Sequence, residues 1–124
     1  MSSDLRVAIV SVPVADQDRA RDFYRDKLGF KVVAEAPMGP DRRWVQLAGP
    51  GGGSAITLVT WFESMPAGSL RGLVIDTADI ETEHARLLAA GVAIEEIKRE
   101  PWGRYAMLRD TEGNSLVLTT LMGR

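Results

Sequence analysis

An internal repeat is the feature of this sequence that most restricts the fold it can adopt. Residues 43–47 (RWVQL) resemble residues 104–108 (RYAML) at an offset of 61, and residues 53–58 resemble residues 113–118 at an offset of 60. A glycine that ends a predicted helix recurs at an offset of 62. Any two strand-loop-strand units look somewhat alike, but the agreement of three offsets favours a duplicated unit. We therefore expect two copies of one supersecondary structure.

The first copy predicts a strand, a helix and three further strands. Residues 7–14 are rich in valine and isoleucine, which favours a strand. Asp16 is a suitable N-cap for the following helix, and Gly29 ends that helix where a left-handed residue is needed. We interpret Phe23 and Tyr24, which have core spacing on this helix, as packing residues. The later strands are expected at 31–35, 43–48 and 55–61.

The second copy repeats this order, so the sequence predicts an α+β fold of two βαβββ modules. Asp79 is the expected N-cap of its helix, and Gly91 ends it. Residues 110–114 (DTEGN) are typical of a hairpin turn in which glycine and asparagine tolerate positive φ. The other predicted elements are strands at 70–75, 92–98, 104–109 and 115–121 and a helix at 80–90.

Length and composition are those of one globular domain, with the first module at about 5–62 and the second at about 70–121. The chain has no cysteine, which excludes disulfides, zinc–thiolate sites and cysteine nucleophiles. The net charge of -2, with no basic stripe, argues against a nucleic-acid partner. Neither a leader-like start nor an apolar run of about eighteen residues is present, so we expect a cytoplasmic protein with no membrane association.

Two signatures bracket most of the chain. The first consists of residues 12–16 (VPVAD) with residues 23–30 (FYRDKLGF), and the second of residues 102–104 (WGR) with residues 110–114. Together they resemble the opening and closing signatures of the vicinal oxygen chelate superfamily, which includes glyoxalase, bleomycin resistance and dioxygenase proteins. This resemblance implies that the two modules form a curved mixed sheet around a cleft. It also implies a homodimer, often with cavities built from both chains.

The resemblance bears directly on metal binding. Enzymes of the superfamily hold a divalent metal through His and Glu side chains at four strand positions, which correspond here to Ile9, Thr57, Leu70 and Val117. None of these residues is a histidine or a carboxylate, and the neutral Thr57 hydroxyl is a weak ligand for a divalent cation. The only histidine, His84, is expected to be solvated on the second helix. We therefore predict a member of the superfamily without a metal or other cofactor.

Side chains alternate between the two faces of a strand, so these four positions predict which other side chains line the cleft. They are mainly apolar and aromatic, with a few neutral hydrogen-bonding groups, as in sites for flat, largely apolar small molecules. The candidate residues are Ile9, Ser11, Trp44, Gln46, Thr57, Val59, Trp61, Leu70, Tyr105, Met107, Val117 and Thr119, with Trp102 at the mouth. The alternative is that these residues only fill a closed core, because a tryptophan is more often a packing residue than part of a binding site.

The leading functional hypothesis is a metal-independent, dimeric binding protein that sequesters an apolar or aromatic small molecule, as antibiotic-binding resistance proteins of the superfamily do. The alternative is an enzyme on the same scaffold, a lyase, isomerase or dioxygenase-like protein that uses non-standard residues. Such an enzyme would need an acid or base in the cleft, for which Tyr105, Glu63 and Arg104 are the available candidates. A third possibility is a subunit-interaction role with a closed core. The catalytic residues of the enzyme alternative stay unassigned.

Overall fold

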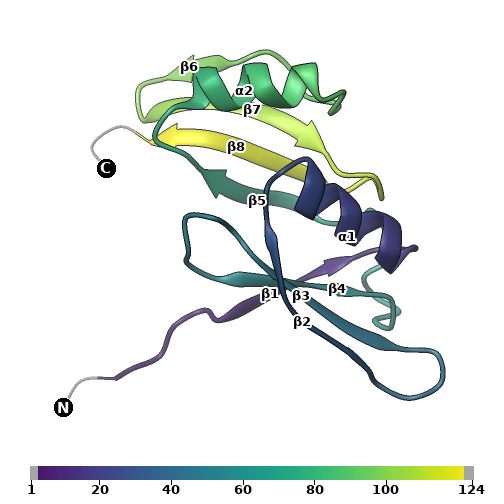
Figure 1. Cartoon of the computed structure of the whole chain (residues 1–124). Coiled ribbons are helices and arrows are strands. Elements are labelled where there is room, and N and C mark those ends of the chain that lie inside the picture. The colour runs from purple at the N-terminus through teal and green to yellow at the C-terminus, as the bar shows by residue number, and fades with distance from the viewer. Residues whose placement is uncertain (1–2, 122–124) are drawn as a thin grey trace.

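A computed structural model describes residues 3–121 and contains two βαβββ units in succession (Figure 1). The first unit comprises β1 (Ile9–Pro13), α1 (Gln17–Asp26), β2 (Lys31–Pro37), β3 (Arg43–Ala48) and β4 (Ala55–Val59). The second comprises β5 (Arg71–Asp76), α2 (Ile80–Ala89), β6 (Lys98–Glu100), β7 (Gly103–Arg109) and β8 (Ser115–Leu121). The predicted α+β class and duplicated unit are confirmed.

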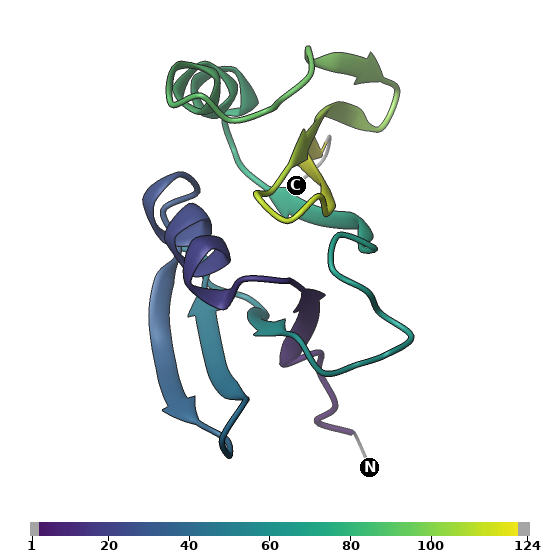
Figure 2. The same cartoon turned by 90° about the vertical axis from the view of Figure 1, so that its right-hand side faces the viewer.

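Each unit forms a four-stranded mixed sheet with the same topology. The strand order is β1-β4-β3-β2 in the first sheet, called sheet 1, and β5-β8-β7-β6 in the second, called sheet 2. The first strand of each unit pairs in parallel with the last, and the other pairs are antiparallel. Figures 1 and 2 show α1 and α2 each lying against its own sheet. One face of each sheet therefore has no helix of its own unit, and we call it the open face.

The helices begin and end where the sequence predicts. The Asp16 carboxylate accepts a hydrogen bond from the Arg19 amide at 3.0 Å, which caps α1. The Asp79 carboxylate caps α2 in the same way through the Thr82 amide, at 3.2 Å. Gly29, the first of the two helix-ending glycines, has a φ of +78°, as expected for a left-handed residue after a helix. The packing assignments of Phe23 and Tyr24 are also confirmed, because both are buried.

The strand predicted at 92–98 is wrong over most of its length. Only an isolated bridge from Ile94 to Leu108 forms there, and β6 is a three-residue strand that begins at Lys98. Between this bridge and β6, the Glu95 carbonyl lies 2.7 Å from His84 Nε2 on α2. We expected His84 to be solvated on the second helix. It is instead half-buried, and its ring is bonded to the backbone.

The turn after β7 forms a buried polar junction between the two units. Asp110 accepts hydrogen bonds from the Tyr24 hydroxyl and from the Asn114 side-chain amide, both at 2.8 Å. The same amide donates to the Pro13 carbonyl at 2.9 Å, and the Asn114 side-chain oxygen accepts from the Leu70 amide at 3.0 Å. Burial, together with the Asp110 carboxylate, raises the pKa of Tyr24, so the hydroxyl stays protonated as the donor. Gly113 has the positive φ expected of this turn, whereas Asn114 does not.

Glu112 extends this junction to the start of α1. Its fully buried side chain forms an ion pair with Arg19 at 2.8 Å and accepts from the amides of Ala15 and Asp16, each at 3.0 Å. Burial alone would raise the pKa of Glu112, but the hydrogen bonds from Arg19, from both amides and from the Thr111 hydroxyl lower it to about 2. The closing signature is therefore structural, because it joins the second unit to the first.

Replacing Glu112 with glutamine is expected to lower the free energy of unfolding at pH 7 by about 3 kcal/mol, since the lowered pKa is worth about that much. This stabilisation is complete above the ordinary glutamate pKa and is lost as the pH falls from about 4.5 towards 2. Urea unfolding across this range should converge for wild type and Glu112→Gln. The exposed control Glu96→Gln should match wild type throughout, and an equal loss in the control would contradict this role of Glu112.

Candidate functional site

The open face of sheet 1 gathers six of the predicted site residues. Ser11 pairs with Thr57, and Thr57 pairs with Gln46, so these three side chains form a row across β1, β4 and β3. Ile9, Trp44 and Val59 are each two residues from this row on their own strands and therefore lie on the same face. All six alternate along their strands with core residues such as Val45 and Leu58.

Two hydrogen bonds fix three side chains on this face. The Trp44 indole Nε1 donates to Gln46 Oε1 at 3.0 Å, which ties an aromatic ring to the neighbouring amide. The Thr57 hydroxyl donates to the Val45 carbonyl at 3.0 Å, and Thr57 is almost fully buried. Its proton is thus committed to the backbone of the neighbouring strand.

The end of β4 differs from the predicted strand. The strand ends at the buried Val59, so the alternation does not extend to Trp61. Trp61 instead lies 6.1 Å from Phe62 between ring centroids, and the Arg42 guanidinium lies 5.8 Å from the Trp61 ring centroid. Such a contact between arginine and indole is a cation–π interaction.

The open face of sheet 2 carries an aromatic stack. The Trp102 and Tyr105 rings are 5.5 Å apart between centroids and inclined by only 19°, and Trp102 is half exposed. Tyr105 pairs with Thr119, and Met107 pairs with Val117, so these four side chains lie on one face of β7 and β8. The structure thus brings together all the predicted residues on these two strands.

Leu70 is not brought together with them. The β5–β8 register shifts between Arg71 and Leu73, at Gly72, whose φ is +78°. Leu70 precedes this irregularity and packs against the buried core. Beyond it, Val74 pairs with Val117 and lies 57% exposed on the open face. A bulge reverses the alternation of side chains, so one strand can contribute residues that simple parity does not predict.

The two open faces do not close on each other within one chain. Among residues 3–121, the Cα atoms of the strands in sheet 1 do not come within 8 Å of those in sheet 2. The units meet elsewhere, through one hydrophobic core that contains Leu28 of the first and Leu87 of the second, and through the polar junction. At the ends of the helices, Lys27 Nζ also donates to the Ala90 carbonyl at 2.9 Å. The predicted residues therefore form two separate surfaces.

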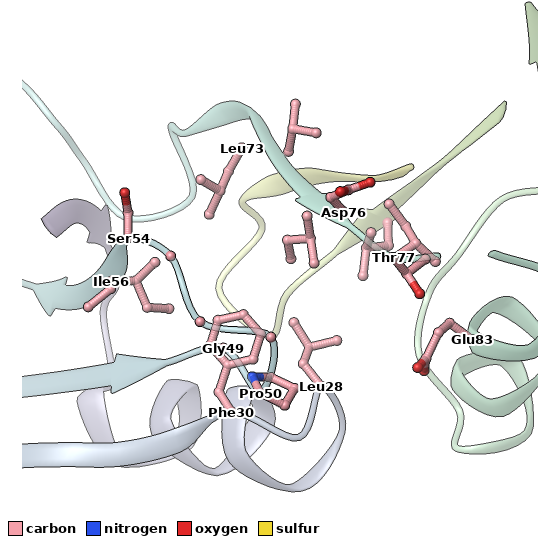
Figure 3. Close-up of a pocket in the computed structure, with 18 of the residues that line it drawn as sticks. Leu28, Phe30, Gly49, Pro50, Ser54, Ile56, Leu73, Asp76, Thr77 and Glu83 are labelled. Carbon is pink, nitrogen blue, oxygen red and sulfur yellow. The ribbon is translucent and has the colours of Figure 1, made fainter. Parts of the chain in front are cut away.

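A hollow of about 680 Å³ lies elsewhere, between the units. In Figure 3, Phe30 and the loop that carries Gly49 and Pro50 line one side of it, and Leu73 on β5 lines another, with Glu83 of α2 at its edge. None of the thirteen predicted site residues lines this hollow. Its strand residues Ile56 and Leu118 belong mainly to the core.

The four strand positions that the resemblance assigns to a metal do not fit a divalent cation here. The side chains of Ile9, Leu70 and Val117 offer no donor atom, and Thr57 is buried with its hydroxyl bonded to the Val45 carbonyl. Within residues 3–121, no group of three or more His, Cys, Asp or Glu side chains could hold a metal ion. No helix in the same part of the chain is long and apolar enough to cross a membrane.

The fold and the residues point to one class of protein, in which two βαβββ units each present an open sheet face. The model of the Glyoxalase/Bleomycin resistance protein/Dioxygenase superfamily matches residues 6–118, and the chain belongs to this superfamily.

Similar structures include TnmS3, an antibiotic-binding protein from Streptomyces sp. CB03234. It is 43% identical, with a TM-score of 0.91 and coverage of 98% of this chain and 99% of TnmS3. A glyoxalase/bleomycin resistance protein from the same organism is 46% identical, with a TM-score of 0.83 and coverage of 92% and 99%. YetH of Bacillus subtilis, an uncharacterised protein, is 30% identical over 117 residues, which cover 91% of this chain and 96% of YetH.

Proposed function

We propose that this protein binds an apolar or aromatic small molecule on its open sheet faces, without a metal, and sequesters it. The observation that carries the proposal is the character of these faces: an aromatic stack on sheet 2 and an indole fixed to an amide on sheet 1, with uncharged residues at the metal positions. Aromatic rings with a few placed polar groups are typical of sites for flat ligands. Similarity to the antibiotic-binding TnmS3 supports an antibiotic-like ligand.

We further propose that the working form is a homodimer. The two open faces stay apart within one chain, and the open face of sheet 2 exposes the large apolar side chains Val74, Trp102 and Leu121. A second copy that places its sheet 2 over sheet 1 of the first would cover these side chains. It would also enclose a cleft between the Trp44–Gln46 pair and the Trp102–Tyr105 stack.

A panel of flat aromatic compounds, including antibiotics, tests this function through tryptophan fluorescence and thermal unfolding. We expect at least one compound to quench the fluorescence and to stabilise the fold, by about 2.7 kcal/mol at a hundredfold excess over its Kd. Dialysis against EDTA beforehand should leave both responses unchanged. Failure of every compound, or loss of binding after EDTA, would contradict the proposal, and conversion of a bound compound would favour the enzyme alternative.

A further inference from the structure

We infer that the ligand presents a hydrogen-bond acceptor, such as a carbonyl oxygen, to the Gln46 side-chain nitrogen, and that Trp44 orients this amide. This inference rests on the proposed binding function and names the chemical class of its ligand. Gln46 is then the residue that determines specificity, and Trp44 is a positioning residue.

The orientation of the Gln46 amide follows from the chemistry of its partner. An indole N–H can only donate a hydrogen bond, so the amide atom 3.0 Å from Trp44 Nε1 must be the oxygen. Rotating the amide by 180° would place two donors against each other. The Gln46 nitrogen, with both hydrogens, is thereby directed away from Trp44.

This nitrogen has no hydrogen-bond partner among residues 3–121, whereas the oxygen of the same amide is bonded. The neighbouring Thr57 hydroxyl donates to the Val45 carbonyl. Gln46 is half-buried, so a ligand on the open face would remove water from an N–H group that then needs an acceptor.

The Ser11 hydroxyl, by contrast, does not distinguish ligands with an acceptor from ligands with a donor. Ser11, at the other end of the row, carries a hydroxyl that can rotate and can both donate and accept. It tolerates either kind of ligand atom. The Gln46 nitrogen can only donate, so it favours ligands with an acceptor at this place and disfavours equally flat ligands without one.

Fluorenone and fluorene test this inference, because they share a flat ring system and differ in one carbonyl oxygen. Tryptophan-fluorescence titrations of wild type should give a Kd about tenfold lower for fluorenone, as one hydrogen bond allows. Gln46→Leu should abolish this preference by weakening fluorenone binding, with fluorene binding unchanged or improved. Trp44→Phe, which keeps an aromatic ring but removes the indole N–H, should reduce the preference without abolishing it.

Fluorene is the internal control in each variant, because a merely structural effect would weaken both compounds alike. Equal affinity of wild type for the two compounds, or a preference that survives Gln46→Leu, would overturn this inference and leave the binding function standing. Binding of neither probe, with no response to the wider aromatic panel, would overturn the proposed function and this inference together.

Discussion

Replacing Gly68 with alanine is expected to lower the free energy of unfolding by about 3 kcal/mol or more. A Cβ atom at this position would lie 2.5 Å from the backbone oxygen of Glu112, and the φ of +81° disfavours any L side chain. The Gly68 amide also donates to the Pro13 carbonyl, so a shift of this loop would disturb the junction between the units. Urea unfolding at pH 7 measures the loss.

Gly52→Ala is the matched control. Gly52 has almost the same φ, +84°, but a Cβ atom there would meet nothing within 4 Å. The control should lose only about 1 kcal/mol, which is the backbone penalty alone. Equal losses in the two variants would show that the close approach to Glu112 contributes nothing.

Replacing Val117 with glutamate is expected to weaken ligand binding at least a hundredfold. Val117 lies half-buried on the open face of β8, next to Met107 and Val74. A carboxylate there would lose its water when an apolar ligand covers it, at a cost of about 3 kcal/mol or more. Titration of wild type and variant with the best compound of the aromatic panel gives the ratio of Kd values.

Leu88→Glu controls for the added charge. Leu88 is 57% exposed on α2, away from both open faces, so binding should be unchanged. Circular dichroism should show that both variants keep their secondary structure. Undiminished binding by Val117→Glu would place the ligand elsewhere, with the hollow lined by Phe30 and Leu73 as the alternative.

The duplicated unit and its helix ends were predictable because they depend on local chemistry. Asp16 and Asp79 cap helices through bonds to residues three positions on, and Gly29 supplies a left-handed end. The break in the strand predicted at 92–98 was not predictable, because at this break the Glu95 carbonyl contacts His84 of another element, which no local pattern shows. The buried junction was missed for the same reason. An aspartate and an asparagine in a turn indicate local bonds, whereas Asn114 reaches Pro13, 101 residues away.

The candidate surfaces were predicted in part. The alternation of side chains along β3, β7 and β8 places Gln46, Tyr105 and Val117 correctly on the open faces, because these strands have a regular register. The alternation fails around β5, because the register shifts at Gly72: Leu70 before it packs against the core, and Val74 after it faces outward. The separation of the two faces within one chain depends on how the units dock, which no local pattern encodes.

A crystal structure of the protein, purified without added metal and bound to the best compound of the panel, tests the central claim most directly. We expect the compound to lie between sheet 1 of one copy and sheet 2 of its partner, in contact with Trp44 and Gln46 on one side and with the Trp102–Tyr105 stack on the other. A compound bound only in the hollow beside Phe30, or held by a metal ion, would contradict it.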